Sequence, residues 1–175
     1  ITAVTFHTHA PPRERAVLLM GVPALADLGA MASASQTIPA ATACEYFGSR
    51  LLTLGGLDDD PRLEGLSFDG GLLLLEVAGT PDQVEEGLAQ AAALADRAGG
   101  AVTARDEAGM SALWHFRHGA SPTIGRALAE GRRSTQFIED CVVPVGDLHR
   151  FVAGLDEILT GAETEAAVFG HAGDG

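Results

Sequence analysis

The spacing of hydrophobic positions over the first hundred residues predicts an alternation of strands and helices. A strand-like pattern runs through 1–9 and ends at Pro11-Pro12, because proline cannot continue a strand ladder. Residues 15–105 then predict the order strand, helix, strand, strand, helix, strand, which is the βαββαβ order of a ferredoxin-like unit. The expected strands lie at 15–22, 38–47, 72–77 and 101–103, and the expected helices at 23–35 and 80–98.

Local signals support the second helix of this unit and the loop before it. Thr80 can cap the helix, and Pro81 fits its first turn. The pair Gly99-Gly100 ends the helix, and the Gly- and Asp-rich segment 55–71 predicts a loop. We therefore expect an α+β fold in which an antiparallel sheet carries helices on one face.

The pattern of the remaining residues predicts a second, incomplete unit of the same kind. We expect a helix over 107–129 with a break near Ser121-Pro122, a strand at 136–143, a helix at 147–159 and a strand at 166–169. The last strand leads into a glycine-rich turn at 171–175, where the sequence stops. The first ferredoxin-like unit thus spans about 15–105 and the second, truncated unit about 106–175. Because the chain also starts at Ile1, we expect it to be a fragment.

Composition and charge narrow the range of partners. The hydrophobic share of 46% is that of a folded globular domain, and 11 basic against 24 acidic residues give a formal net charge of −13. A surface of this charge repels a phosphate backbone, so nucleic acid is not an expected partner. No stretch approaches the roughly 20 apolar residues that span a bilayer. We therefore expect no transmembrane segment and a cytoplasmic protein, at most peripheral to the inner face of the membrane.

The basic and sulfur-containing residues limit the chemistry further. All 11 basic residues are arginine, so an anion site must use guanidinium groups, backbone amides or histidine. Cys44 and Cys141 lie far apart in apolar surroundings, without the CxxC spacing of a zinc or redox site. We expect two buried thiols in a reducing compartment.

Arg117 and Ser121 form the first candidate group for chemistry. Their spacing places them on one face of the expected helix. A guanidinium binds a carboxylate through two hydrogen bonds, and a hydroxyl adds a further donor. Two alternatives stay open: Arg117 pairs with an acid such as Glu107 or Asp140, or Ser121 caps a new helical segment.

The histidines form the second candidate group. His171 precedes two glycines around an acid, and an imidazole at such a sharp turn can reach a metal or a substrate. A surface turn with a solvated histidine is the alternative. His115 and His118 are spaced i, i+3 on the expected helix, and we expect them to be exposed and not to bind a metal, because no third ligand is apparent.

Four segments together resemble a known family: ITAVTFHTHAPP at the start, then LWHFRHGASP, QFIEDCVVPV and the terminal VFGHAGDG. In order and spacing they are similar to the C-terminal, substrate-side (cap) domain of the FAD-linked oxidases. That family includes D-lactate dehydrogenases of the flavin type, the glycolate oxidase D subunit and D-2-hydroxyglutarate dehydrogenase. The resemblance covers nearly all of residues 1–175. It implies that an upstream domain holds FAD and that a small D-2-hydroxy acid is oxidised by hydride transfer to the flavin, with an unidentified electron acceptor.

The resemblance also implies roles for individual residues. Arg117 and Ser121 stand where family members hold the substrate carboxylate. His171 stands at the first ligand of a divalent metal such as zinc, with its partner ligands beyond Gly175. The turn formed by Gly173, Asp174 and Gly175 is expected near the cofactor, and the catalytic base is expected beyond Gly175. The fragment alone is therefore expected to be inactive.

One departure from the family bears on the substrate. Members that act on 2-hydroxyglutarate carry a lysine in the strand where this chain has Ile138, and the chain has no lysine elsewhere. The missing cation favours a monocarboxylate such as lactate or glycolate. Glu139 and Asp140 are then expected to stabilise the sheet or a domain contact. Glu45 and Glu76 could face the flavin side, but the simpler interpretation places them on the solvated face.

Two other functions stay open at this point. The chain could be a stand-alone ferredoxin-like module that binds a regulatory small molecule or mediates oligomer contacts without catalysis. It could also be a degenerate, non-catalytic relative. Fold alone cannot separate these functions, and an upstream flavin-binding domain would favour the oxidoreductase.

Overall fold

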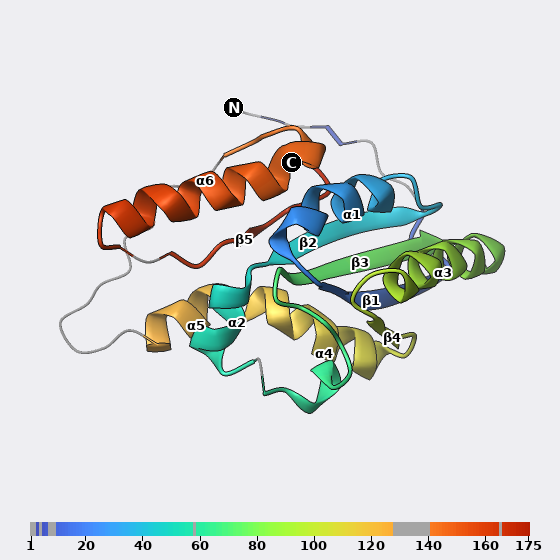
Figure 1. Cartoon of the computed structure of the whole chain (residues 1–175). Coiled ribbons are helices and arrows are strands. Elements are labelled where there is room, and N and C mark those ends of the chain that lie inside the picture. The colour runs from blue at the N-terminus through green and yellow to red at the C-terminus, as the bar shows by residue number, and fades with distance from the viewer. Residues whose placement is uncertain (1–2, 4, 7–9, 58, 128–140, 165) are drawn as a thin grey trace.

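A five-stranded antiparallel sheet with the strand order β4-β1-β3-β2-β5 forms the centre of the computed structural model, which describes residues 3, 5–6, 10–57, 59–127, 141–164 and 166–175. Helices lie on both sides of the sheet (Figure 1). The strands are β1 (Glu14–Val22), β2 (Ala41–Phe47), β3 (Gly71–Gly79), β4 (Ala101–Ala104) and β5 (Phe169–Gly170). The helices are α1 (Leu28–Ser35), α2 (Ser49–Gly55), α3 (Pro81–Asp96), α4 (Glu107–His118), α5 (Ala120–Ala127) and α6 (Leu148–Gly161).

The first four strands, with α1 and α3, form the ferredoxin-like unit that the hydrophobic pattern predicts. β1 pairs antiparallel with β3, from Glu14 opposite Gly79 to Val22 opposite Gly71. β4 flanks β1 and β2 flanks β3, both antiparallel. α1 and α3 pack on one face of this sheet, as expected. The α+β class and the antiparallel sheet are therefore confirmed.

The opposite face of the sheet is covered as well, by α2, α4 and α5 (Figure 1). Val17 and Leu19 of β1 turn to this face and cluster with Leu113 and Phe116 of α4. Burial on both faces explains why β3 carries a run of leucines without polar alternation. The short helix α2 was not expected from the pattern, and the break in the long helix lies at Gly119 instead of Ser121-Pro122.

The expected second unit can be compared with the structure only in part. The helix expected at 147–159 is present as α6, and the strand expected at 166–169 is present as the shorter β5, which pairs with β2. The strand expected at 136–143 falls mostly outside the described residues, and 141–143 are not in a strand. Most of the strand expected at 1–9 also lies outside the described residues. The division into two units stays a prediction.

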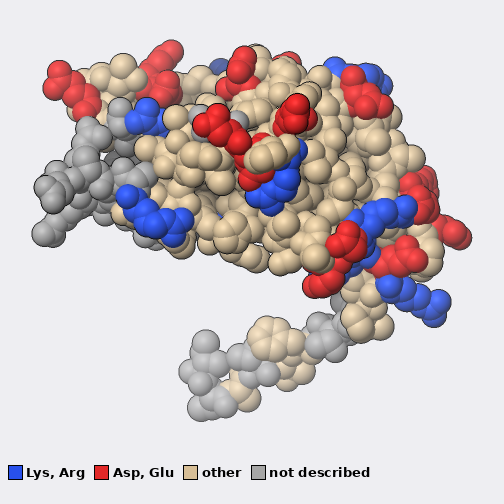
Figure 2. Space-filling view, turned by 90° about the horizontal axis from the view of Figure 1, so that it is seen from below, with Lys and Arg blue, Asp and Glu red and all other residues tan. Residues whose placement is uncertain are grey.

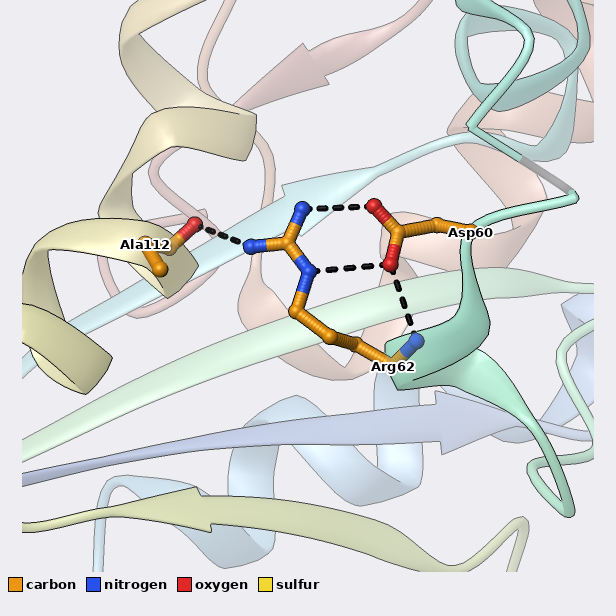
Figure 3. Close-up of polar contacts among 3 residues, drawn as sticks. All are labelled: Asp60, Arg62 and Ala112. Carbon is orange, nitrogen blue, oxygen red and sulfur yellow. Dashed lines mark hydrogen bonds and ion pairs between the residues drawn. The ribbon is translucent and has the colours of Figure 1, made fainter.

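Asp60 and Arg62 fasten the loop between α2 and β3 to α4. Asp60 accepts hydrogen bonds from Nε and Nη2 of Arg62, at 2.9 and 2.5 Å. The guanidinium also donates to the carbonyl oxygen of Ala112 at 2.7 Å (Figure 3) and lies over the ring of Phe116. The hydrogen bond from Arg62 is the main cause that holds the pKa of Asp60 below its usual range. This arrangement holds the loop against α4.

We expect Asp60→Asn to make the unfolding free energy depend less on pH in the acid range. The folded-state pKa of Asp60 is lowered, so its contribution is complete above the unfolded-state pKa of about 4 and is lost as the pH falls through the folded value. At pH 7 the variant should lose about 1.5–3 kcal/mol of unfolding free energy, the usual range for a hydrogen bond to a charged group. Urea unfolding of both proteins between pH 7 and pH 2 measures this pH dependence. Equal slopes of the unfolding free energy against pH below pH 4 would contradict the prediction.

Candidate functional site

Glu45 is the buried centre of the site. It lies in β2, and the alternation of the strand turns its side chain to the face that α4 covers, opposite Leu74 of β3. The carboxylate is only 4% exposed. The expectation that Glu45 lies on the solvated face is therefore wrong. A buried carboxylate needs charged or hydrogen-bonding partners, and two residues from distant parts of the chain provide them.

Arg117, in the last turn of α4, is the first partner of Glu45. Its Nε donates to Oε2 of Glu45 at 2.8 Å, and its guanidinium carbon lies 5.3 Å from the ring centre of Phe169. Arg117 thus pairs with an acid, as one alternative from the sequence expected, and this acid is Glu45. Glu107 pairs with Arg15, and Asp140 lies outside the described residues.

His171 is the second partner of Glu45. It follows β5 directly, and because β5 pairs with β2 through Tyr46 opposite Gly170, the next position along brings His171 opposite Glu45. Nδ1 of the ring lies 2.6 Å from Oε1 of Glu45. The side chain is 66% exposed, and no hydrogen bond between described residues occupies Nε2. The structure therefore brings Arg117 and His171 to one carboxylate.

A second carboxylate lies on the neighbouring strand. Glu76 of β3 accepts a hydrogen bond from Nε1 of Trp114 at 3.0 Å and another from the hydroxyl of Thr42 at 3.1 Å. The ring of Trp114 stacks on that of His118, with centroids 5.8 Å apart. Glu76 is half-buried, so its expected place on the solvated face is also wrong. α4 thus contacts two acids of the sheet, Glu76 through Trp114 and Glu45 through Arg117. These two helix residues lie about one turn apart.

The remaining histidines, Ser121 and the cysteines lie at the edge of this arrangement or outside it. His115 and His118 are exposed, as expected. Ser121 lies inside α5 and is exposed, and no hydrogen bond between described residues joins it to Arg117. The break at Gly119 therefore separates two side chains that a continuous helix would have kept on one face. Cys141 is exposed, which contradicts the expectation of two buried thiols.

Cys44 is buried beside Glu45, and burial is the main cause that raises the pKa of its thiol to about 12. A thiol with this pKa is almost entirely protonated at neutral pH and is a poor nucleophile. It serves as packing next to the site.

The terminal turn docks on the sheet through its backbone. The N–H of Gly173 donates to the carbonyl of Cys44 at 3.0 Å, and Gln36 donates to the carbonyl of Gly173 at 2.8 Å. Gly175 has a φ of +101°, and an added Cβ would overlap the carbonyl oxygen of Val143. Close approach within the chain explains these two glycines. The amide of Gly173 is already bonded and is not free to hold a cofactor.

Charged side chains of both signs lie on the face of α2, α4 and α5 (Figure 2). Figure 2 shows acidic and basic side chains interspersed on this face, with a group of both signs where the N-terminal segment leaves the body. Arg15 pairs there with Glu107, and Arg105 with Glu85. These ion pairs are exposed, and exposed ion pairs contribute little to the stability of the fold.

Among the described residues, no group of three or more His, Cys, Asp or Glu side chains is placed to hold a metal ion. Within the same residues, no helix is long and apolar enough to cross a membrane.

Glu45 is the site residue that sequence reasoning missed. Its signal was present in β2, where it is the single acid in the otherwise apolar run from Ala43 to Phe47. Its partners follow only from the pairing of β5 with β2, which periodicity does not reveal.

Comparison with known proteins identifies the chain. The model of the family described as FAD linked oxidases, C-terminal domain, matches residues 11–175. The chain belongs to this family. A search of curated proteins finds no match. The oxidase domain is thus part of an FAD-dependent oxidoreductase, and the Glu45 site lies within the matched region.

Proposed function

We propose that the oxidase domain forms the substrate side of an FAD-dependent enzyme that oxidises a small D-2-hydroxy acid, of the lactate or glycolate type, to the 2-oxo acid. The observation that carries this proposal is the contact of Arg117 and His171 with one buried carboxylate, Glu45. An anion-binding group and an imidazole then lie within reach of the same small molecule. An upstream domain would hold the FAD.

Arg117 is the proposed group that binds the substrate carboxylate. Glu45 occupies its Nε, and no hydrogen bond between described residues occupies Nη1 or Nη2. These two nitrogens can donate side by side to a carboxylate. The side chain is 27% exposed, so it is reachable from solvent. Ser121 remains a proposed second donor, which α5 would need to bring closer.

The size of the proposed substrate follows from the basic residues near the site. In the 2-hydroxyglutarate-type members a lysine adds a second cation for the dicarboxylate, and this chain has no lysine. The position at which 2-hydroxyglutarate-type members carry lysine is Ile138, which lies outside the described residues. A single guanidinium satisfies one carboxylate, so we favour a monocarboxylate.

In the proposed reaction the C2–H bond breaks and its electron pair leaves as hydride, while the hydroxyl proton passes to a base. When bound, FAD supplies the two-electron acceptor. Arg117 holds the carboxylate, and Nε2 of His171 is available near the hydroxyl. Asp174 and Gly175 are proposed to face the cofactor from the terminal turn.

A metal ion is a further proposal for His171. An imidazole whose Nδ1 contacts a carboxylate is a common form of metal ligand, because the contact orients the ring and leaves Nε2 free. The described residues supply only this one ligand, so they do not by themselves fit a divalent metal such as zinc. No step of the proposed reaction is derived through a metal.

Anaerobic flavin reduction tests the proposed function. The complete flavoprotein is mixed with D-lactate, glycolate, D-2-hydroxyglutarate or L-lactate, and loss of the flavin absorbance is followed. We expect D-lactate or glycolate to reduce the flavin at least about tenfold more efficiently than the dicarboxylate. The second carboxylate of the dicarboxylate would lack a cationic partner, and this costs roughly 1.4 kcal/mol or more of binding free energy. Failure of all four acids to reduce the flavin would rule the proposal out.

A further inference from the structure

We infer that Glu45 is a positioning residue that sets the orientation of Arg117 and His171 together, an inference that rests on the proposed function. The carboxylate does not face the substrate side itself, because its side chain is 4% exposed while that of His171 is 66% exposed. It acts through its two partners. One acid therefore controls both the group that binds the substrate and the imidazole near the reacting carbon.

The two oxygens of Glu45 are divided between the two partners. Oε2 accepts from Nε of Arg117 at 2.8 Å, and Oε1 lies 2.6 Å from Nδ1 of His171. The ring of Phe169 lies under the guanidinium and adds a second contact that restrains it. With Nε bound to Glu45, the N–H groups at the far end of the planar guanidinium, one on each Nη nitrogen, stay available for the substrate carboxylate.

The donor and acceptor types also determine the form of His171. An ionised carboxylate only accepts hydrogen bonds and an arginine only donates them. The short contact between Nδ1 and Glu45 therefore requires the proton on Nδ1. In the neutral ring the lone pair is then on Nε2, the exposed nitrogen. Glu45 thus selects the tautomer of His171 that can accept a proton or bind a cation on the substrate side.

The substitution Glu45→Gln tests this division because an amide cannot reproduce it. Glutamine has nearly the same shape but offers one acceptor and one donor group. Arginine must take the oxygen, so the amide NH₂ turns to His171 and Nδ1 has to accept. We expect His171 to change to the tautomer with the proton on Nε2. In the complete flavoprotein we expect kcat/KM with D-lactate to fall by about 10- to 100-fold, mainly through kcat, because the contact to Arg117 is kept.

Glu76→Gln is the matched control. Glu76 is a strand acid of the same sheet and contacts α4 through Trp114, and no hydrogen bond or ion pair of the described residues joins it to Arg117 or His171. It should leave the tautomer of His171 unchanged and the kinetic constants within about twofold. Flavin content and melting temperature are recorded for both variants. If Glu45→Gln matches Glu76→Gln in tautomer and kinetics, the inference is overturned.

Nitrogen-15 shifts of the histidine rings report the tautomer, with the signal of His171 assigned by its loss in His171→Asn. The measurement uses flavoprotein treated with a chelator, at a pH where the ring is neutral. It also tests the unsubstituted protein, so the inference stays testable if Glu45→Gln does not fold. A proton on Nε2 in the unsubstituted protein contradicts the inference. This readout is independent of substrate, so its result is separate from the failure of every acid to reduce the flavin.

Discussion

Replacing Arg117 with alanine should raise the KM for D-lactate by about 30-fold or more in the complete flavoprotein. The variant removes the proposed partner of the substrate carboxylate, and truncating one member of a hydrogen-bonded charge pair costs roughly 2–5 kcal/mol. At 1.4 kcal/mol for each tenfold change, the lower limit already gives more than a tenfold effect. kcat should change less than KM, because the group acts mainly in binding. Steady-state kinetics with flavin content recorded measures this.

Arg62→Ala is the matched control for this experiment. Arg62 resembles Arg117 in its surroundings: each guanidinium pairs with an acid and lies near an aromatic ring. Arg62, however, fastens the loop to α4 and has no contact with Glu45. Its loss should lower the melting temperature and leave KM within about threefold of the original value. An Arg117→Ala protein with full flavin and an unchanged KM would remove Arg117 from the substrate site.

The largest loss of stability is expected from Gly71→Ala, at the start of β3. Gly71 has a φ of +106°, a conformation that a residue with a Cβ rarely adopts. An added Cβ would also overlap the carbonyl oxygen of Phe47 and come within 2.8 Å of the ring of Tyr46. Backbone strain of about 1–3 kcal/mol and overpacking of about 1–3 kcal/mol act together here. We expect a loss of about 3–5 kcal/mol, measured by urea unfolding.

Gly56→Ala separates the two causes. Gly56, after α2, also has a positive φ, of +59°, but no atom lies within 4 Å of an added Cβ. This variant should lose only about 1 kcal/mol, the strain of a left-handed residue. Equal losses at the two positions would show that the close approach of Gly71 to Phe47 contributes nothing.

The sequence predicts the first unit well because its signals are local. The capping residue Thr80 accepts a hydrogen bond from the backbone of Gln83, as a helix start at this position requires. The run from Leu72 to Leu75 forms the central strand β3. These features depend on neighbours in the chain, and the alternating or periodic pattern records them directly. The presence of helices on both faces was not predicted, because α4 packs on a face that the pattern alone leaves unassigned.

The site was predicted in part, and the missing part is non-local. The roles that the family resemblance implies for Arg117, at the substrate carboxylate, and for His171, at a metal, require the two to lie near each other, and the structure brings both to Glu45. Glu45 was assigned to solvent, because a single acid in a strand is most often on the exposed face. Its burial follows from the pairing of β2 with β5 and from the way α4 crosses the sheet. The partners in one of its contacts are 126 positions apart in the chain, and no local pattern carries that information.

The three members of the site lie on elements of unequal local stability. Glu45 and Arg117 belong to β2 and α4, which pack into the core, whereas His171 follows β5, a two-residue strand at the edge of the described part of the sheet, where it pairs with β2. Such an edge can open while the remainder of the sheet stays intact, with its own, smaller opening free energy. The fraction of molecules with His171 in place is then governed by this local equilibrium, apart from global unfolding. A small acid that touches both Arg117 and His171 would bind only the closed form and would itself hold the edge shut.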